Sequence, residues 1–183
     1  MNTITRFSPS PTVELHIGNI RSAFYSWIYS KKNNGIFILR IEDTDYKRSK
    51  NKYIINIINN MKWLNIKWNN GPYYQINRID KYNKISNKLI KEENAYRCYC
   101  NKKRIKETRN EKLKTNINTR YDGLCKIYIG EKIKNKFVIR FKNINYGITN
   151  INDTIHKNIK VKNEELDDLI IIKNDKTPTY NFA

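Results

Sequence analysis

Residues 36–45 read IFILRIEDTD, and this stretch decides how the chain around it folds. The first six residues are almost all apolar, which is typical of a strand buried in a parallel sheet. Four polar residues, Glu42 to Asp45, follow at the carboxyl end of that strand, where open α/β sheets bind their ligands. We therefore expect a buried strand over 36–41 that leads directly into a polar site.

A strand and a helix are expected upstream of this stretch. Residues 3–8 are β-prone and stop at Pro9, because proline fits after a strand better than within one. Residues 9–19, PSPTVELHIGN, then form a turn, and the helix after it stops over 33–35, Asn-Asn-Gly. An apolar face recurs at helical spacing, formed by Ile20, Ala23, Phe24, Trp27 and Ile28. The order strand, helix, strand predicts an α/β fold in which PSPTVELHIGN and EDTD lie at the same edge of a parallel sheet.

Downstream of the strand, the pattern predicts elements of both kinds. Two amphipathic helices are expected over about 50–64 and 78–93, with a turn of exposed aromatics, GPYYQ (71–75), between them. Residues 98–166 mix short strands with a Lys-rich stretch, and the tail predicts two strands joined by a turn at 174–176. We place the domain boundaries so that the segments are 1–77, 78–166 and 167–183.

Composition limits the class of protein. Hydrophobic residues make up 39% and aromatic residues 12%, which excludes a disordered chain, and the apolar runs are too short to span a membrane. We therefore expect a cytoplasmic protein. The net charge of +19 favours a polyanionic partner such as nucleic acid. The same charge is also expected if the gene is rich in A and T, since the chain holds 26 Lys, 28 Asn and 30 Ile.

The turn PSPTVELHIGN could hold a nucleotide, although neither G-x-x-x-x-G-K-[ST] nor G-x-G-x-x-G is present. Thr12 and His16 can donate hydrogen bonds to a phosphate, and Gly18 allows a ligand close to the backbone. The following helix begins here, and a helix N-terminus attracts anions. The alternative is a purely structural turn at the start of a helix.

TRFSPSPTVELHIGN followed by GIFILRIEDTDYKRS resembles the opening of the glutamyl-tRNA synthetases, class I enzymes whose "HIGH" signature is His16-Ile17-Gly18-Asn19 here. The resemblance continues through GPYYQ, CYC (98–100), YDGLC (121–125) and ELDDLIIIKNDKTPTYNFA. It implies that 1–77 is the first half of a Rossmann-like nucleotide-binding catalytic domain with a parallel sheet. It also implies that 78–166 is an inserted α+β acceptor-binding module and that 167–183 holds truncated return strands of the catalytic domain.

The resemblance implies a glutamate–tRNA ligase that uses ATP with Mg²⁺ to form glutamyl-adenylate and transfers glutamate to the 3′ end of tRNA(Glu). The complete enzyme would be a monomer. The catalytic residues that also hold ATP would be Thr12, His16, Gly18 and Asn19. The glutamate site would comprise Arg6 for the side-chain carboxylate, Glu42 for the ammonium group, and Ser8, Ser10 and Tyr180. Residues near the tRNA would be Arg48, Tyr73 and Tyr74.

The three cysteines are odd in number and do not indicate a disulfide framework. Cys98, Cys100 and Cys125 resemble the zinc site of some members of the family, with Tyr121 as a fourth ligand. Ile127 stands where the family often has a histidine ligand. Bound zinc and three free thiols therefore both remain open.

The chain also departs from the family pattern. Val13 stands where a glycine is usual, and the usual glycine after Asp175 is absent. Residues 84–88, KISNK, are similar to the second class I signature, the lysine loop "KMSKS", but fall within an expected helix, so we expect this chain to lack that loop and the anticodon-binding domain. Three alternatives remain: the paralogue that glutamylates a modified tRNA base, a non-catalytic tRNA-binding remnant, or a subunit of a split synthetase with a partner chain.

Overall fold

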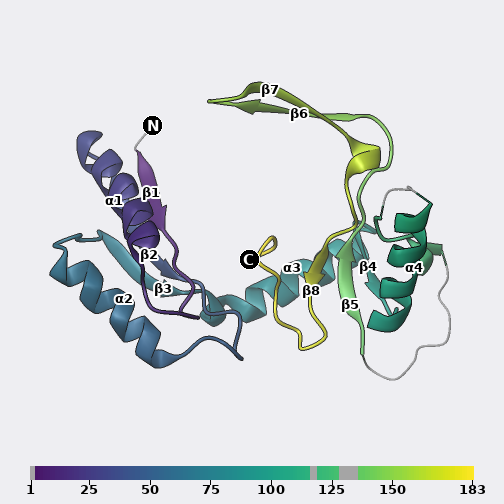
Figure 1. Ribbon diagram of the computed structural model, residues 1–183, viewed down its shortest axis with the longest axis horizontal. Helices are drawn as coiled ribbons and strands as arrows, with labels where there is room; N and C mark the ends of the chain where they lie inside the picture. The colour runs from purple at the N-terminus through teal and green to yellow at the C-terminus, as the bar shows by residue number, and fades with distance from the viewer. Residues whose placement is uncertain (1–2, 116–118, 128–135) are drawn as a thin grey trace. The chain divides into compact units, whose positions relative to one another are not determined.

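The computed structural model describes residues 3–115, 119–127 and 136–183, and the chain divides into two compact units, Met1–Asp80 and Lys81–Ala183. The first unit contains a parallel sheet with the strand order β1-β2-β3 (Figure 1). Its elements are β1 (Ile4–Phe7), α1 (Ile17–Lys32), β2 (Ile36–Ile41), α2 (Asn51–Trp63), β3 (Asn70–Tyr74) and the short 3₁₀ helix η1 (Gln75–Arg78). This confirms the prediction of an α/β fold built on a parallel sheet.

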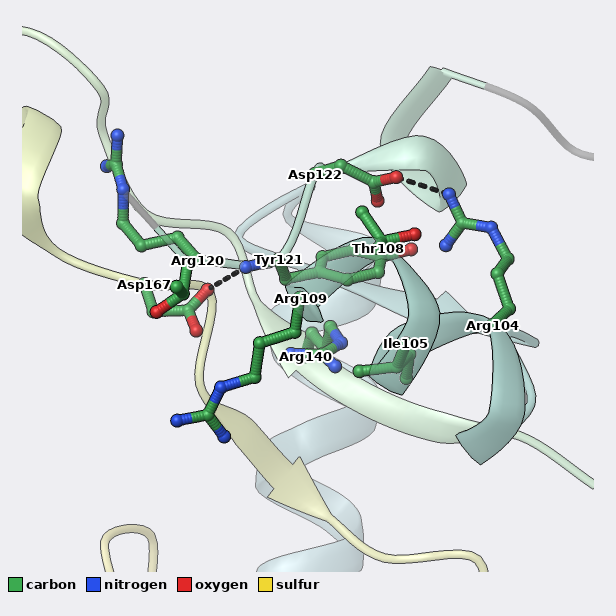
Figure 2. A pocket seen from close by; sticks show the side chains of 10 residues that line it. Arg104, Ile105, Thr108, Arg109, Arg120, Tyr121, Asp122, Arg140 and Asp167 are labelled. Carbon is green, nitrogen blue, oxygen red and sulfur yellow. Dashed lines mark hydrogen bonds and ion pairs between the residues drawn. The ribbon is translucent and has the colours of Figure 1, made fainter. Parts of the chain in front are cut away.

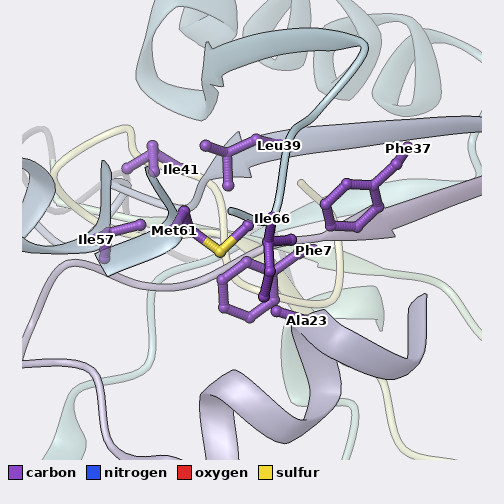
Figure 3. Close-up of a cluster of buried hydrophobic side chains, with 8 residues drawn as sticks. All are labelled: Phe7, Ala23, Phe37, Leu39, Ile41, Ile57, Met61 and Ile66. Atoms are coloured by element: carbon purple, nitrogen blue, oxygen red, sulfur yellow. The ribbon is translucent and has the colours of Figure 1, made fainter. Parts of the chain in front are cut away.

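One face of β2 forms the centre of the first core. Phe37, Leu39 and Ile41 are all 0% exposed, and they cluster with Ala23 of α1 and Met61 of α2 (Figure 3). Both helices therefore pack on the same face of the sheet, as two right-handed crossovers in one direction require. The residues of β2 that point to the other face, Ile36, Ile38 and Arg40, are only half-buried. The expectation of a fully buried strand holds for one face only.

The expectation of a turn at GPYYQ is wrong, because most of this stretch forms the strand β3. Asn70 pairs with Ile38 and Tyr73 with Arg40, and the register shifts between the two pairs. The shift falls at Gly71, whose φ is 102° and whose added Cβ would lie 2.3 Å from the Leu39 carbonyl oxygen. Only glycine accepts this conformation and this close approach without strain. Proline is tolerated because β3 is an edge strand.

The second unit is α+β and contains an antiparallel sheet with the order β4-β5-β8 and a separate two-stranded sheet, β6-β7 (Figure 1). Its core joins Ala95, Ile139, Ile171 and Ile172. The helices are α3 (Ile79–Lys91), which begins just before the unit boundary, α4 (Lys102–Lys114), α5 (Leu124–Ile127) and the 3₁₀ helix η2 (Asn163–Glu165). The strands are β4 (Ala95–Cys98), β5 (Val138–Phe141), β6 (Ile148–Asp153), β7 (Lys157–Lys162) and β8 (Ile170–Ile172).

The positions of residues 84–88 and of the tail can be compared with their predictions. Residues 84–88 lie within α3, as expected of an amphipathic helix. The tail forms β8 and turns back so that Ile172 bridges Pro178 in the antiparallel sense. β8 pairs with β5 of the second unit, and the assignment of 167–183 to the catalytic domain stays a prediction. Among the described residues, no helix is both long and apolar enough to cross a membrane.

Candidate functional site

The first candidate site lies where β1 and β2 end, at the carboxyl edge of the parallel sheet. The loop after β1 and the loop after β2 are joined by main-chain hydrogen bonds. Glu42 N donates to Pro9 O at 3.0 Å, and Lys50 N donates to Pro11 O at 3.1 Å. Asp43 is buried and accepts a hydrogen bond from Ile76 N at 2.9 Å, which fixes the chain after β3 to the same edge. PSPTVELHIGN and EDTD are therefore neighbours.

His16 is the N-cap of α1, and its ring orientation is fixed by the backbone. Gly18 N donates to His16 Nδ1 at 3.1 Å, and His16 N donates to Asn19 Oδ1 at 3.3 Å. Because Nδ1 accepts a hydrogen bond, the proton of the neutral ring lies on Nε2, which is left as a donor. An added Cβ on Gly18 would lie 2.9 Å from His16 Cε1, so glycine leaves the space that the ring occupies. The imidazole is exposed and positioned at a helix N-terminus.

The face of the sheet opposite the helices carries charged side chains. Arg6 is exposed on β1 opposite Ile38, and Arg40 lies two residues further along β2. Arg40 Nη2 lies 2.6 Å from Glu42 Oε1, and Glu42 is 8% exposed. The sequence interpretation gave Arg40 no role in the site. Its spacing of two from Glu42 was the available signal, because residues i and i+2 of a strand share a face.

Three polar atoms at this edge lack hydrogen-bond partners within the described part of the chain: Ser8 Oγ, Arg40 Nε and Ser49 Oγ, all buried. Buried polar groups are nearly always paired in native structures, so each unpaired one needs an explanation such as a ligand. Ser10 is exposed and Thr12 half-buried, and Thr12 N donates to Ser10 O at 2.9 Å, which makes a tight turn.

The remaining predicted residues lie in varied environments. Arg48 is largely exposed and pairs with Asp45, with Nε 2.8 Å from Oδ2. Tyr73 is 45% exposed on β3, whereas Tyr74 is half-buried against the first core. Tyr180 is 80% exposed and belongs to the second unit, so its predicted place in the glutamate site stays a prediction.

The second candidate site is a thiol cluster in the second unit. The three Sγ atoms of Cys98, Cys100 and Cys125 lie within 4.8 Å of one another, and those of Cys100 and Cys125 are 3.5 Å apart. The Tyr121 hydroxyl lies 3.4 Å from Cys98 Sγ and 3.2 Å from Cys100 Sγ. Arg104 Nη1 donates to Cys100 Sγ at 3.1 Å, which places a positive charge beside the cluster.

The environment shifts the pKa values of Cys100 and Cys125 in opposite directions. Burial raises the pKa of the Cys100 thiol to about 11. Burial also acts to raise the pKa of Cys125, but hydrogen bonds from the Tyr121 hydroxyl and the Tyr99 backbone outweigh it and leave that pKa below its ordinary value. Burial raises the pKa of Tyr121, and its contacts with the thiols raise it further.

The cluster fits a tetrahedral zinc ion. Zn–S bonds of about 2.3 Å place the sulfurs of a tetrahedral site roughly 3.8 Å apart, close to the separation of Cys100 and Cys125. The Tyr121 hydroxyl adds an oxygen within 3.4 Å of two of the sulfurs. The four predicted ligand residues are therefore together.

Asp168 joins several segments near the thiol cluster and was missed at the level of sequence. It is 6% exposed, and its Oδ2 accepts from Tyr96 Oη at 2.6 Å and lies 2.7 Å from Lys126 Nζ. Its Oδ1 accepts from Asn143 N at 3.0 Å. Burial, followed by the hydrogen bond to Asp168, raises the pKa of Tyr96 well above its ordinary value, so its proton stays in place. No sequence motif marks this arrangement, because its members are far apart along the chain.

Residues 2–183 match the family model for tRNA synthetases class I (E and Q), catalytic domain. The chain is 50% identical to glutamate–tRNA ligase of Wigglesworthia glossinidia brevipalpis, over 100% of this chain and 39% of that protein. It is 49% identical to glutamate–tRNA ligase 2 of Coxiella burnetii (strain Dugway 5J108-111), over 98% of this chain and 38% of that protein. The chain therefore spans less than half the length of these curated relatives.

Solved structures of glutamate–tRNA ligases also match this chain over its whole length. A glutamate tRNA ligase from Elizabethkingia meningosepticum CCUG26117, in complex with its amino acid, matches with a TM-score of 0.86 at 30% identity, over 100% of this chain and 40% of that chain. Glutamate-tRNA synthetase from Elizabethkingia anophelis matches with a TM-score of 0.87 at 30% identity, over 100% of this chain and 41% of that chain.

Proposed function

This chain belongs to the class I tRNA synthetases of the E and Q type, and from that we propose that it is the N-terminal part of the catalytic domain of a glutamate–tRNA ligase. The observation that carries the proposal is the meeting of the loops after β1 and β2, which puts the His16 cap and Glu42 at one sheet edge. The proposed reaction is activation of glutamate by ATP with Mg²⁺ and transfer to the 3′ end of tRNA(Glu).

The ATP phosphates would lie at the N-terminus of α1. The helix end attracts anions, and His16 Nε2–H is aimed by the hydrogen bond at Nδ1. Attack of the glutamate α-carboxylate on the α-phosphate would form glutamyl-adenylate, break the bond to the β-phosphate and release pyrophosphate. Negative charge builds on the phosphate oxygens in this step, and a donor fixed in advance stabilises that charge without reorganisation. Thr12, Gly18 and Asn19 shape the turn that holds the nucleotide. Catalysis would come from positioning and electrostatics, without a covalent bond between the substrate and the protein.

The glutamate would bind on the helix-free face of the sheet. Arg6 offers a two-pronged cation for the side-chain carboxylate, which lysine cannot copy. Glu42 would accept the substrate ammonium group through the oxygen that Arg40 does not engage. Ser8 Oγ and Ser10 would complete the polar shell, and the unpaired Ser8 hydroxyl supports a polar ligand at this place. Tyr180 is proposed for the opposite wall.

The second unit would bind the acceptor end of the tRNA, together with Arg48, Tyr73 and Tyr74. Cys98, Cys100, Tyr121 and Cys125 would hold zinc, whose contribution when bound is structural. We expect the complete enzyme to act in the cytoplasm as a monomer.

The test is transfer of labelled glutamate to tRNA(Glu) by the natural gene product that carries these residues, with His16→Ala as the variant. Loss of one transition-state donor lowers kcat more than about tenfold. Lys31→Ala, at the exposed far end of α1, is the matched control and should leave kcat unchanged. Unchanged kcat in His16→Ala would remove this residue from catalysis, and no ATP-dependent transfer by the wild type would remove the proposed function.

The same assay separates the alternative reaction. Transfer to the 3′ end requires the terminal adenosine, so a tRNA without it should accept no glutamate. Glutamate incorporated into that shortened tRNA would instead identify the paralogue that modifies a base.

A further inference from the structure

A cavity of about 290 Å³ lies between α4 and the chain around Tyr121 (Figure 2). It adjoins the thiol cluster, because Tyr121 and Arg104 line it and also contact Cys100 Sγ. By volume it holds on the order of ten water molecules, since each occupies about 30 Å³ in the liquid. Its lining carries four arginines and two aspartates, an excess of two positive charges. The charged residues are Arg104, Arg109, Arg120, Arg140, Asp122 and Asp167.

Arg140 is the unusual member of this lining. It is 5% exposed, and its guanidinium lies 4.0 Å from the centre of the Tyr121 ring. Its Nη1 donates to the Asp168 carbonyl oxygen at 2.7 Å, whereas its Nε is buried and has no partner among the described residues. Within the same residues, no carboxylate lies within 4.0 Å of it. A buried charge without a counter-ion is costly, and the cost falls when an anion binds beside it.

The two aspartates of the lining do not neutralise Arg140. Asp122 is bound by Arg104, and Asp167 Oδ1 accepts from Tyr121 N at 3.2 Å. Arg109, on the exposed face of α4, makes no hydrogen bond or ion pair within the described ranges. Figure 2 shows Arg109 extending away from the Tyr121 ring, and this long side chain at the rim can turn toward a ligand. Arg120 is held in place, because its Nη1 donates to Leu166 O at 3.2 Å. Thr108 adds a hydroxyl donor.

We propose that this cavity binds one phosphate group of an RNA backbone, with Arg140 and Arg109 as its cationic partners. Arginine guanidinium groups bind phosphate through two parallel hydrogen bonds, and no carboxylate of the described residues forms an ion pair with Arg140. The net charge of +19 favours RNA over a free anion as the source of the phosphate. This inference rests on the proposed function, because a tRNA substrate supplies the RNA.

The test compares Arg109→Gln with Lys103→Gln in the natural gene product, using an RNA hairpin with the acceptor-stem sequence of tRNA(Glu). Lys103 lies on the same helix but does not line the cavity, and its pair with Glu107 at 4.0 Å is exposed and weak. Arg109→Gln should lower the affinity for the RNA hairpin about fivefold. It should also make the plot of log binding constant against log salt concentration less steep, by about one in slope. Lys103→Gln should change affinity less than about twofold. Arg109 is exposed, so its loss should leave the fold intact.

Equilibrium dialysis with labelled inorganic phosphate identifies the source of the anion. Saturable phosphate binding that weakens in Arg109→Gln supports the cavity as the site. If phosphate binds but the two variants bind the RNA equally, the occupant is free phosphate and the RNA assignment is wrong. If the two variants bind phosphate equally and also bind the RNA hairpin equally, the cavity is not an anion-binding site. Absence of glutamate transfer alongside a clear difference between the variants would refute the proposed enzyme activity and leave the cavity assignment standing.

Discussion

In the first unit, the polar residues come from two loops at one edge of a sheet, and main-chain hydrogen bonds such as Glu42 N to Pro9 O hold those loops together. In the second unit, the polar residues come from β4, α4, β5, α5 and the chain before β8, and side chains hold them together. Replacing an exposed site residue of the first unit, such as Arg6 or His16, should therefore change function with little loss of stability. In the second unit, the same kind of change should destabilise the fold.

The largest effect expected from this comparison is that of Asp168→Asn. The change leaves Lys126, whose side chain is 18% exposed, without its buried partner, and it weakens the bond to Tyr96. Breaking a buried ion pair costs about 3 kcal/mol or more. All three tryptophans lie in the first unit, so their fluorescence reports that unit during urea unfolding, while far-ultraviolet circular dichroism reports both.

Asp168→Asn should move a circular dichroism transition to lower urea and leave the tryptophan transition in place. Glu164→Gln, which removes an exposed carboxylate 3.8 Å from Lys162, is the control and should move neither. If both signals shift together in Asp168→Asn, the two units unfold as one, and the contrast between them is wrong.

A second effect concerns the thiols, which differ in pKa within one cluster. In metal-free protein at pH 8, the raised pKa of about 11 keeps Cys100 protonated, whereas the lowered pKa of Cys125 increases its thiolate fraction. Since the thiolate is the reactive form, iodoacetamide should modify Cys125 more than about tenfold faster than Cys100. Peptide mass spectrometry measures both rates.

The raised pKa of Cys100 and the lowered pKa of Cys125 determine how the selectivity of modification changes with pH. Raising the pH toward 11 ionises Cys100 and should remove the selectivity, and unfolding the protein should also equalise the rates. Saturating zinc should protect both thiols if the cluster holds the metal. Faster modification of Cys100 at pH 8 would show that the hydrogen bonds of Tyr121 do not control the cluster.

The same contrast explains what could be predicted from the sequence. The parallel sheet and the meeting of PSPTVELHIGN with EDTD were predictable, because adjacent parallel strands end at the same edge and each loop is continuous in sequence. The three cysteines were recognisable by residue type. Arg140 and Asp168 were not, because their burial depends on contacts with Tyr121 and Tyr96, which are distant along the chain.

The strand β3 shows a different limit. Gly71 and Pro72 are turn residues by their local preference, and that preference predicted a turn. Pairing with β2 overrode it, because an edge position tolerates proline and the close approach to Leu39 requires glycine. Parallel pairing joins residues that are far apart along the chain, so no local sequence pattern predicted it.

The smallest effect concerns the turn before Pro178, where the chain lacks the glycine usual in the family. Lys176 has a φ of 63°, the left-handed conformation that costs residues with a Cβ about 1–2 kcal/mol. Lys176→Gly removes this strain, and because glycine loses more entropy on folding, the net gain should be about 0.5–1 kcal/mol. Lys173→Gly, in the same turn but with negative φ, should instead cost about 0.5–1 kcal/mol. Because the turn belongs to the second unit, urea unfolding followed by circular dichroism should show the shift, while the tryptophan fluorescence transition stays fixed. Equal shifts of the circular dichroism transition in the two variants would mean that backbone strain at Lys176 does not lower the stability of this unit.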